Sequence, residues 1–253
     1  RPPSGPSPAE WTIARRADHR TPSGPSHAER TTAYIGGVTV QPVRLVLASA
    51  SPARRATLQR AGIDPTVVVS DVDEERALTD AEQRYGPLEP AHVALLLARA
   101  KAEAVAYGPD CPTNSVVLGC DSVLELDGEL HGKPADAAEA TARWGRMSGR
   151  SGALHTGHWL IDQRHDGTSG MLGASASTVV HFGVMSPEDV AAYVATGEPL
   201  RVAGAFTLDG LGAPYVRGIE GDPSNVVGLS LPLLRSLLAD LDLAWRDLTG
   251  PLS

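Results

Sequence analysis

The sequence predicts an α/β protein built on a mixed β-sheet, and three observations support this class. Short apolar runs of the kind that form buried strands recur along the chain. Segments with helix-capping residues and apolar positions at helical spacing lie between these runs. The pair Asp127-Gly128 separates two strand-like runs and predicts a hairpin, so at least two strands are expected to be antiparallel.

The first predicted strand leads directly into the first predicted helix. Residues 44–48 (RLVLA) form an apolar run suited to a buried strand. A helix is expected to follow, with Ser51 as its N-cap, Pro52 at its first position and Gly62 beyond its end. A strand followed by a helix is the repeating unit of an α/β fold.

The remaining elements continue this alternation. Apolar runs predict strands at 66–70, 115–119 and, half-exposed, 177–184. Capping residues or apolar stripes predict helices at 90–107, 136–147, 186–197 and 231–241. The apolar stripe of the first of these helices consists of Val93, Leu96, Leu97 and Ala100.

Residues 1–42 are expected to lie outside the folded domain, which is assigned to residues 43–253. The segment is rich in Pro, Ser and Gly, and PSGPSPAE at 3–10 recurs as PSGPSHAE at 22–29. Such a composition buries too little apolar surface to offset the entropy lost on ordering. The segment is therefore predicted to be disordered.

Composition and charge exclude several classes of function. Apolar residues make up 42% of the 253 residues and the formal net charge is -8, which disfavours binding to a nucleic acid polymer because that needs a basic surface. No run approaches 18 apolar residues, and the N-terminus lacks the apolar core of a secretory signal, so no membrane association is expected. A cytoplasmic protein with Cys111 and Cys120 reduced is predicted.

Lysine is rare in this chain, which makes each lysine informative. Among the 22 basic residues only Lys101 and Lys133 are lysines, and the rest are arginines. Where arginine serves as the generic cation, a retained lysine indicates a site that needs a compact ammonium on a flexible stem. The alternative is that two solvated lysines remained by chance.

The first candidate site is the segment 49–55 (SASPARR), between the first strand and the first helix. A helix N-terminus presents unpaired N–H groups and suits phosphate, and Ser49, Ser51 and Arg54 would add donors. The alternative is a plain N-cap with solvated arginines.

Carboxylates supply the second and third candidates. Residues 71–75 (DVDEE) follow a predicted strand, and a cluster of acids on a loop suits Mg²⁺, although a solvated acidic turn is the alternative. Asp121 sits just beyond the apolar run 115–119, where it could hold a metal or take a proton from water. An aspartate that only caps a turn would look the same.

The fourth candidate is Lys133, on the predicted turn Gly132-Lys133-Pro134. The surrounding GELHGKP is not a P-loop, because one spacer residue is missing and Pro134 replaces the required hydroxyl. The glycines at 210–212 do not form a dinucleotide-binding motif, and the histidines show no metal-binding spacing.

Seven fragments occur along the chain in one order: LVLASASPARR, SDVDE, LARAKAEAVA, LGCDSVLELDGELHGKP, GRSGALHTG, YVATGEPLRVAGAF and GLGAPYVRGIEGDPSNVVGLSLPLL. Over residues 44–238 the chain thereby resembles the Maf family of nucleoside triphosphate pyrophosphatases. The resemblance implies an elongated, twisted mixed sheet flanked by helices, Maf/ITPase-like, with a central phosphate-binding cleft. It further implies hydrolysis of nucleoside triphosphates, canonical or modified, to monophosphate and pyrophosphate, dependence on Mg²⁺ or Mn²⁺, and often a homodimer.

Carried over residue by residue, the resemblance assigns the phosphate contacts. It implies that Ser49, Ser51 and Arg54 bind the triphosphate. It implies that Lys101 and Lys133 neutralise the charge of the triphosphate during water attack on the α-phosphorus. Both rare lysines thus fall at positions that the family uses.

The resemblance also assigns the carboxylates, and the chain departs from the family at the base site. It implies that Glu74 holds the metal and that Asp121 activates water or shares the metal. Ala53 and Asp209 stand where the known subgroups carry Arg with Gln, or Trp with Glu, so the preferred base stays open. Asp209 could accept hydrogen bonds from a base, and Ser122 replaces the usual Thr after the catalytic Asp.

Two other functions remain as alternatives. A nucleotidyltransferase also begins with a strand and an Arg-containing loop, but it needs a glycine-rich loop where this chain has Ser-Ala-Ser-Pro. A non-catalytic, nucleotide-binding regulator of septum formation is the second alternative. The presence of both carboxylates and both lysines favours catalysis, because a pure binder needs no base.

Overall fold

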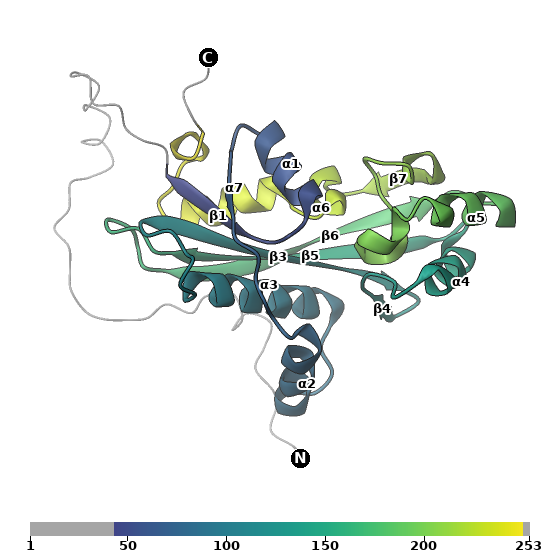
Figure 1. Cartoon of the computed structure of the whole chain (residues 1–253), viewed down its shortest axis with the longest axis horizontal. Helices are drawn as coiled ribbons and strands as arrows, with labels where there is room; N and C mark the ends of the chain where they lie inside the picture. Colours follow the sequence, from purple (N-terminus) through teal and green to yellow (C-terminus); the bar gives the residue numbers. More distant parts are fainter. Residues whose placement is uncertain (1–42, 250–253) are drawn as a thin grey trace.

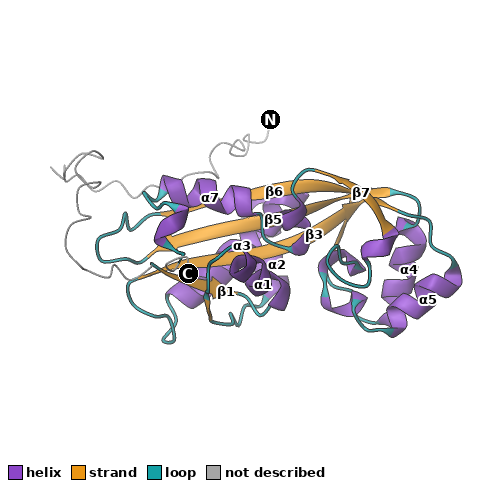
Figure 2. Cartoon of the chain, turned by 90° about the horizontal axis from the view of Figure 1, so that it is seen from above, coloured by secondary structure: helices purple, strands orange, loops and turns teal. Residues whose placement is uncertain are grey.

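The computed structural model describes residues 43–249 and confirms an α/β fold with a mixed sheet flanked by helices (Figure 1). The molecule is elongated along its longest strands (Figure 2). The predicted disordered extension, residues 1–42, lies outside the described residues. No helix in the described range 43–249 is long and apolar enough to cross a membrane.

One seven-stranded sheet forms the centre of the molecule. Its strands are β1 (Arg44–Ala48), β2 (Thr66–Val67), β3 (Ser115–Leu126), β4 (Glu129–His131), β5 (Ser151–Asp162), β6 (Met171–Phe182) and β7 (Val216–Glu220). Their order is β2-β1-β3-β5-β6-β7, with β4 paired to β3. The pairs of β1 with β2 and β3 are parallel and all others are antiparallel, as a mixed sheet requires.

Helices cover both faces of this sheet (Figures 1 and 2). They are α1 (Pro52–Arg60), α2 (Glu74–Tyr85), α3 (Pro90–Ala106), α4 (Ala137–Met147), α5 (Pro187–Ala195), α6 (Pro223–Val227) and α7 (Leu231–Asp240). Short 3-10 helices lie at η3 (Pro199–Arg201), η4 (Ala203–Ala205), η5 (Ala213–Tyr215) and η6 (Trp245–Asp247). Helices α4 and α5 lie together at one end of the molecule, away from α1 and α7.

Alternate residues of the strands pack into separate cores, as the two-residue period of a strand requires. Leu45 and Leu47 of β1 face a core shared with α1 and α7, whereas Val46 faces the core beneath α3. Trp144 of α4 centres a third core at the end of the molecule that holds α4 and α5. The long central strands therefore link cores that different helices complete.

Helix α3 lies unusually close to the sheet because two glycines face it. A Cβ on Gly119 would come within 2.1 Å of the Ala98 carbonyl oxygen, and one on Gly157 within 2.2 Å of the Ala94 carbonyl oxygen. The predicted apolar stripe was therefore partly wrong. Alanines contact the sheet, Val93 and Leu97 are buried toward α2, and Leu96 and Ala100 are only half-buried.

Several boundaries differ from the sequence expectation. The strand predicted at 66–70 is only two residues long, because it pairs with β1 at the edge of the sheet through Thr66 and Val67 alone. The strand predicted at 115–119 continues to Leu126, since pairing with β5 holds its polar residues in the ladder. The predicted hairpin is confirmed, with φ of 57° at Asp127 and 77° at Gly128.

A fully buried histidine on β5, His158, makes the stability of the fold depend on pH. His158 accepts a hydrogen bond from Ser230 N–H at 2.8 Å through Nε2 and donates from Nδ1 to the Thr156 carbonyl at 3.1 Å. Burial, aided by the charge of Arg54, lowers the pKa of His158 to about 4. Below pH 6.5 the unfolded chain therefore binds a proton that the folded chain does not.

We expect this histidine to remove about 2 kcal/mol from the free energy of unfolding between pH 7.5 and pH 5. The stability is complete above the unfolded pKa and is lost as the pH falls from 6.5 towards 4. Urea unfolding at the two pH values should show a smaller acid loss for His158→Gln than for the wild type. Equal losses would mean that His158 takes up its proton as readily in the folded protein as in the unfolded chain.

Candidate active site

The candidate site lies at an open edge of β3, residues 120–123. β1 pairs with β3 up to Gly119, and β4 pairs with it from Leu124 onward. Within the described chain, residues 120–123 between these partners pair only with β5, on the other side. The end of β1 leads into the segment 49–55 and the end of β4 leads into Lys133, so two predicted phosphate-binding segments flank this edge.

Three charged side chains meet beside this open edge. Lys101 of α3 donates a short hydrogen bond to Asp121 Oδ1 and lies 2.8 Å from Glu74 Oε1, so its ammonium bridges the two carboxylates. The side chains of Lys101 and Asp121 are each only 12% exposed, whereas Glu74 is half-exposed. The predicted catalytic residues Asp121, Glu74 and Lys101 are thus brought together.

Burial sets the electrostatics of this triad. It raises the pKa of Asp121 above its usual value, although the charges of Lys101 and Arg54 oppose the shift. A buried carboxylate with a raised pKa holds a proton more strongly than an exposed one does. Asp121 is therefore suited to accept a proton during a reaction.

Local sequence explains how the three residues reach one another. Gly119 admits α3 close to the sheet, which places Lys101 over Asp121. Asp73 caps α2 by accepting a hydrogen bond from Arg76 N–H at 2.9 Å, so Glu74 begins that helix. The predicted acidic loop was wrong in this respect, because the helix N-cap ends the loop at Asp73 and the other carboxylates of the cluster are exposed. Only Glu74 joins the triad.

Asp121 also lies differently from its predicted place. It was expected just beyond a five-residue strand, but it lies within β3, paired with Gly157 of β5. Pairing on one side fixes its backbone, while the missing partner on the other side leaves the open edge. The sequence did not reveal this because Asp121 and Ser122 interrupt the apolar run.

Arg54 organises the segment between β1 and α1. Its guanidinium is buried and donates to the Gly228 carbonyl at 2.7 Å, the Cys120 carbonyl at 2.8 Å, Ser49 Oγ at 3.0 Å and Ser122 Oγ at 3.0 Å. These bonds use four of the five guanidinium N–H donors. The alternative of solvated arginines is wrong for Arg54, and the expected triphosphate contact would fall on its one remaining donor.

Both serines that are predicted to bind phosphate accept hydrogen bonds within the segment 49–55. Ser51 is confirmed as the N-cap of α1, accepting a hydrogen bond from Arg54 N–H at 3.4 Å. Ser49 is buried and accepts from Ser51 N–H at 3.2 Å as well as from Arg54. Their hydroxyl hydrogens are not committed by these bonds, so both can still donate to a phosphate oxygen.

A buried network of hydrogen bonds lies behind Arg54, and the sequence did not predict it. Ser122 Oγ lies 2.9 Å from Thr156 Oγ1, which donates to the Asn225 carbonyl at 3.2 Å. Asn225 in turn donates to the Leu154 carbonyl at 3.2 Å and to Thr178 Oγ1 at 3.1 Å. These residues come from four elements far apart in the sequence, and no local motif marks them.

Lys133 lies apart from the charged triad. It is exposed on the turn after β4, and no hydrogen bond or ion pair joins its ammonium to another residue in the described range. The antiparallel register carries the chain back from His131, opposite Leu124, towards Asp121. At about 3.4 Å per residue, Leu124 is about 10 Å from Asp121 along β3.

Asp209, the predicted base contact, faces the far end of α1. Its Oδ2 lies 3.5 Å from Arg60 Nη2 in an exposed ion pair. Arg60 is the last residue of α1, but its side chain turns back along the helix, because Nε donates to the Ala56 carbonyl at 3.2 Å. Asp209 therefore lies beside α1 rather than at its N-terminus, where phosphate binding is predicted.

The loop that carries Asp209 is fastened by a carboxylate that the sequence reading did not identify. Glu198 accepts hydrogen bonds from Thr207 Oγ1 at 2.5 Å, Tyr193 Oη at 3.0 Å, Leu211 N–H at 3.0 Å and Gly212 N–H at 3.1 Å. Burial pushes the pKa of Glu198 up, but these hydrogen bonds outweigh it and lower the pKa below its usual value.

Removing this carboxylate should loosen the loop. We expect Glu198→Ala to raise amide hydrogen exchange at Leu211 and Gly212 by about tenfold or more, because each N–H loses a charge-assisted bond. Exchange measured by NMR or mass spectrometry tests this. Glu188→Ala, an exposed glutamate of α5, is the matched control and should change nothing. Equal exchange in the two variants would show that the loop holds without Glu198.

The carboxylates of the triad suit a hard divalent cation. Within residues 43–249 no group of three or more His, Cys, Asp or Glu side chains is arranged to hold a metal ion. Glu74 and Asp121 nevertheless converge on one ammonium, so their oxygens are close enough to share a cation. Mg²⁺ commonly takes one or two protein carboxylates and completes its shell with phosphate oxygens and water. The donor set therefore fits the predicted Mg²⁺ or Mn²⁺.

Fold and site together define an α/β protein in which a helix N-terminus lies beside a buried and a half-exposed carboxylate that share one lysine. The Maf-like protein family model matches residues 44–241, and the chain belongs to the Maf family. A protein of Salinispora tropica named nucleoside triphosphate pyrophosphatase is 58% identical over 205 residues, which cover 80% of this chain and 85% of that protein. One of Streptomyces coelicolor with the same name is 54% identical over 218 residues, covering 85% and 98%.

A solved structure also aligns with the chain, but weakly. It is the crystal structure of a nucleoside-triphosphatase / dITP/XTP pyrophosphatase from Mycobacterium abscessus, with a TM-score of 0.33 and 14% identity. The alignment covers 79% of this chain and 96% of that one. At this score the alignment does not bear on the fold, and the family assignment stands on sequence.

Proposed function

We propose that this protein is a nucleoside triphosphate pyrophosphatase, which hydrolyses its substrate to a nucleoside monophosphate and pyrophosphate. The observation that carries the proposal is the meeting of Lys101, Glu74 and Asp121 at the open edge of β3. Relatives of 58% and 54% identity bear the name of this activity, which supports the same conclusion.

The triphosphate would bind along the open edge of β3. The N-terminus of α1, with the hydroxyls of Ser49 and Ser51, supplies hydrogen-bond donors and the positive end of a helix dipole. Lys101 and Lys133 supply flexible positive charge from the two sides of this edge. Asp209, which forms an ion pair with Arg60 of α1, would contact the base.

The chemistry would be attack of water on the α-phosphorus. A bond forms between the water oxygen and phosphorus, the bond to the bridging oxygen breaks, and pyrophosphate leaves with the electron pair. Asp121 takes the proton from water, which its buried position and raised pKa favour. Lys101 holds Asp121 in place and offsets negative charge on the departing pyrophosphate.

A divalent cation bound by Glu74 and Asp121 would act as a Lewis acid and make water more acidic. Glu74 is half-exposed and its carboxylate forms an ion pair with Lys101 alone among the described residues, so it can turn to a cation. The role of Glu74 is thus separate from proton transfer. Its position at the start of α2 fixes only its backbone.

The activity is tested by pyrophosphate release from a panel of common and modified nucleoside triphosphates, with Mg²⁺, Mn²⁺ or a chelator. The proposal predicts metal-dependent formation of pyrophosphate and monophosphate in equal amounts. The rates across the panel also give the base preference that Ala53 and Asp209 leave open. Tight nucleotide binding without turnover on any substrate would contradict the proposal and favour a nucleotide-binding regulator.

A further inference from the structure

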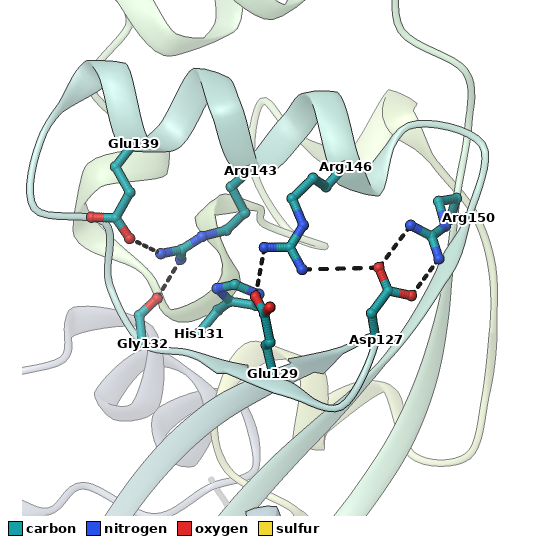
Figure 3. Close-up of polar contacts among 8 residues, drawn as sticks. All are labelled: Asp127, Glu129, His131, Gly132, Glu139, Arg143, Arg146 and Arg150. Atoms are coloured by element: carbon teal, nitrogen blue, oxygen red, sulfur yellow. Dashed lines mark hydrogen bonds and ion pairs between the residues drawn. The ribbon is translucent and has the colours of Figure 1, made fainter.

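We propose that Arg143 and Glu139 of α4 are positioning residues that hold Lys133 at the open edge of β3. The inference rests on the proposed function, because it concerns the placement of a lysine in that site. Figure 3 shows the two side chains reaching from α4 to the turn that follows β4, which carries Lys133.

The two residues hold the turn from both ends. Arg143 Nη1 donates to the Gly132 carbonyl at 2.5 Å, and Glu139 Oε2 accepts from Ala135 N–H at 2.7 Å. Arg143 and Glu139 are also hydrogen-bonded to each other through Nη2 and Oε1. Gly132, immediately before Lys133, and Ala135, two positions after it, are therefore both hydrogen-bonded to a single ion pair.

Two further contacts restrict the turn. The Gly132 carbonyl also accepts from Gly204 N–H at 3.1 Å, so two donors hold it. Pro134 is buried, and its ring fixes its own φ and keeps the preceding residue extended. The backbone of Lys133 is left with little freedom, although its side chain is exposed.

The burial of Arg143 indicates a role beyond packing. Its side chain is only 3% exposed, and burying a guanidinium carries a desolvation penalty that its hydrogen bonds and ion pair must offset. Those bonds go to an exposed turn and a half-exposed glutamate rather than to a polar core. A methionine would fill the same space without the desolvation penalty.

Two neighbouring arginines form exposed surface ion pairs and provide a comparison for Arg143. Arg146 and Arg150 are 40% and 51% exposed and pair with Glu129 and Asp127 of the β3–β4 hairpin. Figure 3 shows all three arginines side by side, and only Arg143 reaches the turn. Arg146 is therefore a matched control from the same helix.

The experiment is a double-mutant cycle on kcat and KM for pyrophosphate release by the full chain. It uses Lys133→Ala, Arg143→Met and the double variant. We expect Arg143→Met to lower kcat/KM by about 10- to 100-fold, because a misplaced contact costs on this order. In the Lys133→Ala background the same change should have almost no further effect, since its target is already gone. Arg146→Met should stay within about twofold of the wild type.

A second variant allows the test to be made even if Arg143→Met does not fold, and two results would contradict the inference. Glu139→Ala removes a half-exposed side chain, so it replaces Arg143→Met if that variant does not fold. Effects of Lys133 and Arg143 that multiply independently would overturn the inference. If Lys133→Ala turns over normally, the inference also fails, while pyrophosphate release by the wild type would leave the proposed function intact.

Discussion

Asp121→Asn is expected to lower kcat for pyrophosphate release by about 10²- to 10⁴-fold, the usual contribution of a general base. Asparagine keeps the size of the side chain but cannot take a proton from water. It also leaves Lys101 paired with Glu74, so the positive charge at the open edge of β3 keeps a partner. The fold should survive, because Asp121 is held in β3 by its backbone pairing with β5.

Steady-state kinetics with the best triphosphate substrate, together with a thermal unfolding curve, test this prediction. Glu125→Gln is the matched control, since Glu125 is a carboxylate on the same face of β3, four residues further on, and pairs with His155 instead. Its kcat should match the wild type. A kcat for Asp121→Asn within about threefold of the wild type would mean that another group takes the proton.

Arg54→Lys is expected to destabilise the protein by about 3–5 kcal/mol, because each buried acceptor that loses its donor costs about 1–3 kcal/mol. The guanidinium donates to four acceptors contributed by β3, the segment after β1 and the residue after α6. An ammonium cannot reach all four at once, so buried oxygens would be left without a donor. Charge is conserved, which makes this a test of geometry.

Chemical denaturation of Arg54→Lys and of Arg55→Lys provides the comparison. Arg55 is the next residue of α1 and is exposed, so its replacement should change the free energy of unfolding by less than about 0.5 kcal/mol. Similar values for the two variants would show that the four hydrogen bonds contribute little. In that case Arg54 would be free to serve the triphosphate as its main contact.

The sequence was informative wherever a short segment decides the structure. The N-cap at Ser51 and the hairpin at Asp127-Gly128 follow from local backbone chemistry, and both are confirmed. The retained lysines led to Lys101, which lies at the centre of the charged triad. The resemblance to the Maf family predicts Glu74 and Asp121 in one site, and both carboxylates contact Lys101.

The features that the sequence did not predict depend on contacts between distant segments. The length of β3 is fixed by its pairing with β5, which the break in apolar residues at Asp121 concealed. The four acceptors of Arg54 lie up to 174 positions away, so no local pattern predicts its burial. The same is true of Glu198, whose bonds organise the loop around Asp209.

Hydrolysis in ¹⁸O-enriched water, with mass spectrometry of both products, tests the proposed reaction most directly. Attack on the α-phosphorus at the open edge of β3 predicts ¹⁸O in the nucleoside monophosphate and none in the pyrophosphate. Label in the pyrophosphate, or release of orthophosphate in place of pyrophosphate, would contradict attack on the α-phosphorus.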